Sequence, residues 1–217
     1  MSELTLVIGN KNYSSWSLRP WLAMKQAELD FQEIRIPLYA ENSREEILKY
    51  SPSGKVPVLL HNNLVIWESL AICEYIAEQF EPGLWPEDGK IRAIARSVSH
   101  EMHGGFFALR QNMPMNCRAR HPGQGMTPEV EKDIQRISEI WRDCRTEYGQ
   151  DGDFLFGNFS IADAMFAPVV LRFVTYGVKL GAIEQEYADT IYNLHNLQAW
   201  VEAGVQETEI IADAEIY

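Results

Sequence analysis

Apolar and polar positions follow two different periods over the first 80 residues. A continuous apolar run at residues 4–8 ends in a Gly-Asn pair, which predicts a buried strand. Residues 31–36 alternate apolar and polar, as a half-buried strand does. Two further apolar runs flank a His-Asn-Asn turn and predict a hairpin. Helical spacing predicts helices over residues 18–29, 43–50 and 68–80, so the predicted order is β-α-β-α-β-β-α.

The pattern changes after residues 81–89, which contain two prolines and two glycines and predict a linker. Apolar residues at helical spacing then predict a helix over residues 91–109 and another near the end of the chain. Thr127 before Pro128 predicts a further helix start, because the hydroxyl can cap the helix and proline has no N–H to satisfy there. Residues 90–217 are therefore expected to be all-helical.

The composition limits which binding partners and which cellular compartment are expected for this protein. The formal net charge is −12, and such a surface repels nucleic acid and anionic lipid. The three cysteines, Cys73, Cys117 and Cys144, form no CxxC pair, which argues against redox chemistry, a disulfide framework and a structural zinc. We expect a reducing compartment, no signal peptide and no membrane span, since no stretch approaches the ~20 apolar residues of a transmembrane helix.

Two dipeptides in the first half carry groups that suit a peptide-like ligand. A cis bond between Val56 and Pro57 would expose the backbone of Val56 to a ligand along the strand edge, although an ordinary trans proline is the commoner alternative. Glu68 and Ser69 begin a helix, where the dipole attracts a carboxylate while Glu68 attracts an ammonium. The pair therefore suits an α-amino acid head group; the alternative is that both residues merely cap the helix.

The stretch NYSSWS, residues 12–17, lies at the start of the first predicted helix and holds three serines. A serine hydroxyl at a helix N-terminus can donate to a thiolate and lower the pKa of that thiol below ~8.5. Because the chain has no paired cysteines, we expect the ligand to bring the thiol. We predict Ser17 as the N-cap, which makes Pro20 the third helical residue. The alternative is a serine-rich loop without any thiolate contact.

Taken together, these features resemble the glutathione S-transferase family, and the resemblance covers essentially the whole chain. Its motifs are SSWSLRPWLAM, SPSGKVPVL, ESLAICEYI and FSIADAMFAP, the last holding a capping box of Ser160 and Asp163. The resemblance implies an α/β thioredoxin-like N-terminal domain over residues 1–80 that binds glutathione. It also implies a linker over residues 81–89 and an all-α domain over residues 90–217 that contributes the electrophile site.

The family's glutathione site, carried over by motif, implies roles for five residues. Val56, before a cis Pro57, would exchange backbone hydrogen bonds with the cysteinyl unit. Glu68 and Ser69 would hold the γ-glutamyl head group, and Lys55 would contact the glycyl end.

The catalytic serine of zeta-class members falls on Ser14, with Ser15 as the close alternative. Tyr13 ranks below these serines, because the family's catalytic tyrosine lies earlier, near the end of the first strand. The chain also departs from the zeta class. Trp16 replaces the zeta-class cysteine, and Thr175 stands where the class has its substrate-binding arginine. Both departures argue against maleylacetoacetate isomerase activity.

The electrophile pocket is expected between the domains, where ligand pockets often lie. Its candidate lining residues are Met102, His103, Phe106 and Arg110. The alternative for the apolar members is the domain core. No metal is expected, since the pair of histidines here does not form HExxH. We further hypothesise that residues 113–128 form a mobile flap whose arginines meet an anionic substrate, against the alternative of an ordinary solvated loop.

The resemblance implies a cytoplasmic, homodimeric transferase that uses glutathione as co-substrate. The thiolate would attack a small electrophile or a peroxide, in detoxification or in a metabolic step. The alternative is a non-catalytic relative that uses the fold as a binding or regulatory module. The intact Glu68-Ser69 and Val56-Pro57 pairs favour the enzyme, because a scaffold has little physical need for them.

Overall fold

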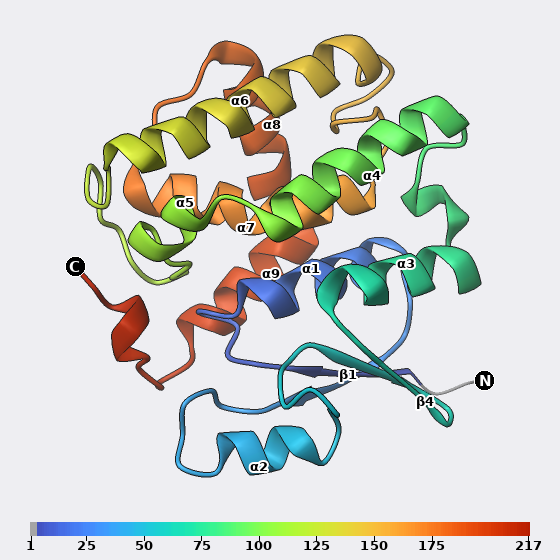
Figure 1. Ribbon diagram of the computed structural model, residues 1–217, viewed down its shortest axis with the longest axis vertical. Helices are drawn as coiled ribbons and strands as arrows, with labels where there is room; N and C mark the ends of the chain where they lie inside the picture. Colours follow the sequence, from blue (N-terminus) through green and yellow to red (C-terminus); the bar gives the residue numbers. More distant parts are fainter. Residues whose placement is uncertain (1–3) are drawn as a thin grey trace.

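The computed structural model describes residues 4–217, and its first half is a mixed four-stranded sheet with three helices (Figure 1). The strand order is β2-β1-β3-β4, with β1 parallel to β2, and with β3 antiparallel to both β1 and β4. The elements are β1 (Leu4–Ile8), α1 (Ser15–Gln26), β2 (Gln32–Arg35), α2 (Ser43–Leu48), β3 (Val58–His61), β4 (Leu64–Trp67) and α3 (Ser69–Gln79).

The alternation of side chains along β1 determines which helix covers which face of the sheet. Leu6 and Ile8 point to the side where α1 and α3 pack, and they belong to the main core. Val7 points the other way and forms a smaller core with Ile47 of α2 and Val58 of β3. Figure 1 accordingly shows α1 and α3 on one side of the sheet and α2 on the other.

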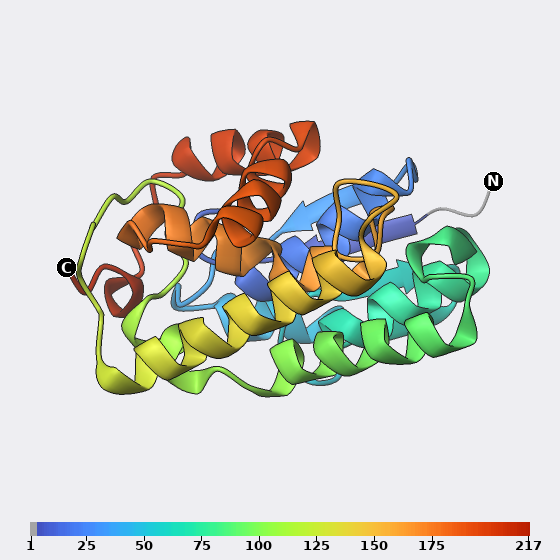
Figure 2. The ribbon, with the colours of Figure 1, turned by 90° about the horizontal axis from the view of Figure 1, so that it is seen from above.

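Among the described residues, every named element after β4 and α3 is helical. The helices are η1 (Pro82–Leu84), α4 (Gly89–Gly104), α5 (Phe107–Asn112), α6 (Pro128–Tyr148), α7 (Ile161–Tyr176), α8 (Ala182–Tyr192), α9 (His195–Val205) and η2 (Ala212–Ala214). Within α7 every residue except Val174 is buried, and this helix packs against α1, α4 and α8. Figure 2 shows α7 inside the helical layer, where it joins that layer to the sheet domain.

The predicted element order is confirmed, while one predicted helix is in fact two. The expected helix over residues 91–109 ends at Gly104, and α5 begins at Phe107. Between them Phe106 adopts a left-handed backbone with φ 60°, and a Cβ on Gly105 would lie 2.8 Å from the Glu101 carbonyl oxygen. Apolar periodicity continues across this break, which is why the pattern hides it. The domain limits at residues 80 and 90 stay a prediction.

Both cap motifs predicted for the helical half form. Thr127 accepts from the backbone N–H of Val130, and Pro128 occupies the first helical position of α6. The capping box at Ser160 and Asp163 opens α7. Within residues 4–217, no helix is both long and apolar enough to cross a membrane.

Candidate functional site

The N-cap of α1 is Ser14, which lies in the turn before the helix. The predicted N-cap, Ser17, is therefore wrong. Ser14 Oγ accepts from the Ser17 backbone N–H at 3.3 Å and donates to Ser17 Oγ at 2.8 Å. Ser17 Oγ in turn accepts from the Gly9 backbone N–H at 3.1 Å. The helix therefore starts earlier than predicted, and Pro20 is its sixth residue instead of its third. The N–H of Ser14 donates to the Asn10 carbonyl, a tight turn that the serine run does not reveal.

The hydroxyls around Ser14 point in different directions. Ser15 Oγ lies 3.4 Å from Nη2 of Arg172, an arginine of α7. Tyr13 directs its hydroxyl to Glu215 in the C-terminal segment, at 2.6 Å. The Tyr13 hydroxyl is thus occupied by a partner in the C-terminal segment. Ser14, by contrast, lines a surface hollow together with Val56.

The Val56-Pro57 bond is cis, as the resemblance implied. The two residues lie just before β3 and line a hollow of about 410 Å³. The other residues around this hollow are Trp16, Ser53, Lys55, Trp67, Glu68 and Ser69. Residues from three separate stretches, the starts of α1, β3 and α3, therefore meet at one place on the surface.

Glu68 holds an uncommon backbone conformation at this hollow. It is the residue before α3, with φ 78° and ψ 122°, and its side chain caps nothing. A non-glycine residue in this region costs of order 1–3 kcal/mol and persists where the surroundings or the function demand it. Its carboxylate lies 3.0 Å from Nε2 of His103, which reaches over from α4. The capping alternative for Glu68 is therefore wrong.

Ser69 complements the Glu68 carboxylate with a free polar group. Its Oγ is buried and has no hydrogen-bond partner among the described residues. A buried hydroxyl without a partner is uncommon in native proteins, and a ligand is one way to satisfy it. Beside it, the first N–H groups of α3 favour an anion.

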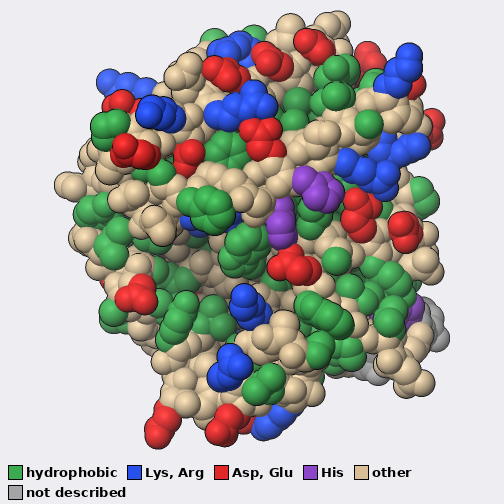
Figure 3. Space-filling model, in the orientation of Figure 1, with side chains coloured by type: hydrophobic (Ala, Val, Ile, Leu, Met, Phe, Trp, Pro, Cys, Tyr) green, Lys and Arg blue, Asp and Glu red, His purple; other side chains and the backbone are tan. Residues whose placement is uncertain are grey.

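A second hollow of about 420 Å³ adjoins the first and shares Trp16, Lys55 and Val56 with it. It adds Ser14 from the start of α1 and Arg44 from α2. Figure 3 shows both basic and acidic side chains around α2, and acidic and histidine side chains near the C-terminal part of α4, on the same face. The two hollows thus form one groove, with the Glu68 carboxylate at one end, Arg44 and Glu41 at the other, and Lys55 lining both.

The four residues predicted to line the electrophile pocket divide into two pairs. Met102 is 1% exposed and Phe106 is also buried; both belong to the main core and neither lines either hollow, so their place in the electrophile pocket stays a prediction. His103 and Arg110 instead contact Trp16: the His103 ring lies 5.2 Å from the Trp16 ring, and the Arg110 guanidinium lies 4.7 Å from it. Helical spacing alone does not separate core-facing from cleft-facing positions at a helix end.

The flap hypothesis for residues 113–128 is also wrong. Arg118 donates to Tyr13 Oη and to the carbonyls of Glu207 and Glu209, which ties the segment to the C-terminal tail. The His121 ring packs 5.9 Å from that of Tyr217. Neither Arg118 nor His121 lines either hollow, and the tail, which carries no strong sequence signal, supplies partners to both.

The chain's own thiols are not nucleophiles at neutral pH. Cys73, Cys117 and Cys144 are buried, and burial raises the pKa of each to about 12. Thiol chemistry here needs a thiol from a ligand. Across residues 4–217, no cluster of three or more His, Cys, Asp or Glu is placed to hold a metal ion.

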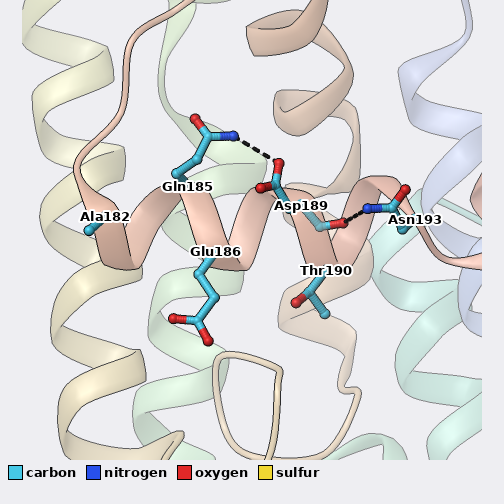
Figure 4. Close-up of a pocket in the computed structure, with 6 residues that line it drawn as sticks. All are labelled: Ala182, Gln185, Glu186, Asp189, Thr190 and Asn193. Atoms are coloured by element: carbon cyan, nitrogen blue, oxygen red, sulfur yellow. Dashed lines mark hydrogen bonds between the residues drawn. The ribbon is translucent and has the colours of Figure 1, made fainter.

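A further hollow of about 530 Å³ lies elsewhere, along one side of α8 (Figure 4). Several of its polar side chains form hydrogen bonds within or next to α8. Gln185 donates to the Asp189 carboxylate and Asn193 donates to the Asp189 carbonyl, both at 2.8 Å. A shallow surface on a single helix, without converging elements, does not resemble a ligand site. The groove between α1, β3 and α3 remains the candidate.

Comparisons with known proteins agree with this geometry. Residues 13–79 match the family described as "Glutathione S-transferase, N-terminal domain", and residues 127–203 match "Glutathione S-transferase, C-terminal domain". Glutathione S-transferase 1 of Dianthus caryophyllus is 41% identical over 170 residues, covering 75% of this chain and 74% of that protein. A probable maleylacetoacetate isomerase of Caenorhabditis elegans is 35% identical over 96 residues, or 44% of each chain. This chain belongs to the glutathione S-transferase family.

Solved structures confirm the fold. A glutathione transferase homolog from Burkholderia, with bound glutathione, superposes with a TM-score of 0.72 at 21% identity, covering 94% of this chain and all of that one. An epsilon-class glutathione S-transferase from the housefly, Musca domestica, gives 0.73 at 19% identity, over 94% of this chain and 95% of that one. The α/β thioredoxin-like domain followed by an all-helical domain is therefore the glutathione S-transferase fold.

Sequence reasoning missed three residues that contribute to the groove or its surroundings. Trp16 lines both hollows, Arg44 lines the second, and Arg172 reaches Ser15 from α7. The sequence distinguishes Trp16 only as a departure from the zeta class. Arg172 sits one helical turn before Thr175 in a helix of uniformly buried residues, so no sequence periodicity distinguishes it.

Proposed function

We propose that this protein is a glutathione transferase that activates the glutathione thiol for attack on a small electrophile or a peroxide. The observation that carries the proposal is the convergence of the Val56 backbone, Glu68, the unpartnered Ser69 hydroxyl and Ser14 on one groove. Glu68 and Ser69 suit an α-amino acid head group, the Val56 backbone suits a peptide, and Ser14 suits a thiol. No feature of the groove favours a non-catalytic role over catalysis.

In the proposed complex, glutathione lies along the groove from α3 to α2. Its γ-glutamyl ammonium meets Glu68, and its carboxylate meets Ser69 and the first N–H groups of α3. Its cysteinyl unit pairs with the backbone of Val56. The glycyl carboxylate points to Lys55. Arg44 is proposed as an additional contact, because it lines the second hollow together with Lys55.

The thiol then faces the start of α1, with Ser14 or Ser15 as its hydrogen-bond donor. Ser14 lines the groove, but its hydroxyl donates to Ser17 and has to turn to reach a thiolate. Ser15 accepts from Arg172 and retains its own O–H to donate. Lowering the thiol pKa and holding the thiolate near its target are the catalytic contributions expected here.

A pH titration of thiolate absorbance tests this assignment. Glutathione bound to the wild-type protein is expected to have a thiol pKa about two units below the free value of ~8.5, a differential stabilisation of ~2.7 kcal/mol. Either Ser14→Ala or Ser15→Ala, but not both, is expected to return the pKa toward the free value. Thr127→Ala, a cap remote from the groove, serves as control. Failure of the wild-type protein to bind glutathione would refute the function.

The electrophile is proposed to bind where the two domains meet, beside the thiol. Trp16 offers a partly exposed aromatic surface there, and His103 and Arg110 flank it. An apolar or aromatic electrophile with a polar substituent fits these groups. Whether the reaction serves detoxification or a metabolic step is decided by which electrophile the cell supplies.

The protein is also proposed to act as a cytoplasmic homodimer. Three free cysteines favour a reducing compartment. Strand β4 lies at the edge of the sheet and exposes Leu64 and Val65, while Ile94 of α4 is exposed as well. An exposed apolar edge strand is a surface that soluble proteins normally cover.

Light scattering on a sizing column tests the dimer. We expect a mass of twice 24.9 kDa for the wild-type protein. Val65→Lys, which places a charge on the exposed edge, is expected to shift the population to monomer, while Val205→Lys, at an exposed apolar position of α9, leaves the mass unchanged. A wild-type monomer at micromolar concentration would contradict the proposal.

A further inference from the structure

Three arginines from different helices surround the first turn of α1. The Arg19 guanidinium lies 4.3 Å from the Trp16 ring centroid, and that of Arg110 lies 4.7 Å from it. Arg172 reaches Ser15 Oγ at 3.4 Å. Arg19 and Arg172 are buried, and Arg110 is partly so. We call Arg19, Arg110 and Arg172 the arginine cluster.

The arginine cluster forms no ion pair with a carboxylate among the described residues. Its members donate instead to backbone carbonyls: Arg19 to Met165, Arg172 to Met113 and Pro168, and Arg110 to Met102, His103 and Gly105. Nη1 and Nη2 of Arg19 are buried and have no hydrogen-bond partner within residues 4–217. Buried cations are normally paired with an anion, so this cluster is electrostatically incomplete.

Burial lowers the pKa of all three arginines, and repulsion between arginines adds to this for Arg19 and Arg172. The pKa of Arg172 falls to about 9, first because of burial and then because of Arg110. Burial followed by repulsion from Arg110 and Arg172 also lowers the pKa of Arg19. All three side chains nevertheless remain cations at pH 7, since guanidinium groups stay protonated in proteins.

The titratable groups around the arginine cluster do not cancel its net positive charge. Glu68 and Asp133 are the nearby carboxylates, and they act on Arg19 and Arg110 respectively without pairing with them. Burial raises the pKa of Cys73, Cys117 and Tyr176 to about 12, so these groups are neutral at pH 7. His103 faces Arg19, Arg110 and Glu68, and burial lowers its pKa.

We propose that the arginine cluster supplies the positive potential that stabilises the thiolate of glutathione bound at the start of α1, with Arg172 acting through Ser15. The inference rests on the proposed function. Arg172 donates to Ser15 Oγ, which polarises that hydroxyl and leaves its O–H free for the thiolate. A cation held near a thiol favours its charged form. These arginines are positioning residues, since none is proposed to touch the sulfur.

The decisive measurement is the thiol pKa of bound glutathione in charge-neutral and charge-keeping variants. Arg172→Gln is expected to raise this pKa by about one unit, so that tenfold less thiolate is present at a pH well below it. Arg172→Lys keeps the charge and is expected to change it much less. Arg110→Gln is expected to give a smaller rise. Arg136→Gln removes an exposed arginine that pairs with Glu101 and serves as the matched control.

The outcomes separate this inference from the proposed function. Circular dichroism and glutathione affinity verify that each variant is folded and binds. If Arg172→Gln fails to fold, because Arg172 also supports two carbonyls, Arg110→Gln carries the test alone. A folded, glutathione-binding Gln variant with the wild-type thiol pKa overturns the inference and leaves the transferase proposal standing. Absence of glutathione binding by the wild-type protein overturns both.

Discussion

Glu68→Gln is expected to weaken glutathione binding about 100-fold, on the order of 2–3 kcal/mol. Glutamine keeps the shape of the side chain but removes the charge that meets the γ-glutamyl ammonium. Isothermal titration with glutathione measures the effect. A glutathione analogue without the α-amino group makes the test sharper, because it is expected to bind the wild-type protein and the Gln variant with nearly equal affinity.

Two matched variants separate binding from folding. Glu78→Gln changes an exposed carboxylate on the same helix, away from the groove, and is expected to bind glutathione like the wild type. Glu68→Gly relieves the backbone conformation at φ 78°, so it is expected to lose affinity while unfolding at the same or a slightly higher temperature. Undiminished affinity in Glu68→Gln would contradict the head-group assignment.

Asp163→Ala is expected to lower the free energy of unfolding by about 3–5 kcal/mol. The buried Asp163 carboxylate accepts from the backbone N–H groups of Leu155 and Ser160 and from the Ser160 hydroxyl, at 2.8 to 3.1 Å. Alanine leaves both N–H groups buried without an acceptor. Urea unfolding measures the loss, and Ser160→Ala, which removes only the cap hydroxyl, is expected to cost about 1 kcal/mol. Equal costs for the two variants would contradict this account.

The same carboxylate predicts a pH trend. Burial raises the pKa of Asp163 to about 6, against ~3.9 in the unfolded chain. Between these values the folded state binds more protons, so the contribution of Asp163 to the free energy of unfolding falls as the pH rises from about 4 to 6. Above pH 6 the contribution becomes constant. The difference in unfolding free energy between wild type and Asp163→Asn is expected to follow this course.

Local chemistry in the sequence determined much of the fold. Runs and alternation of apolar residues predicted the order of the N-terminal elements, and turn residues marked the change to helices. The caps at Thr127 and at Ser160 with Asp163 depend on neighbours within three residues, so the sequence contains all that they need. Motifs around Val56 and Glu68 similarly predicted which stretches meet at the groove, because each stretch lies at a fixed point of a strand or helix.

Only the tertiary structure decided which side chains face the groove and which partners they have. Ser14 rather than Ser17 caps α1 because the chain closes a turn onto Asn10. Met102 faces the core, and the segment around Arg118 is held by a tail about 90 residues further along the chain. Arg172 and Ser15, 157 residues apart, meet only when α7 packs on α1. Sequence patterns encode local periodicity and caps, whereas electrostatic contacts of this kind depend on how distant helices are packed together.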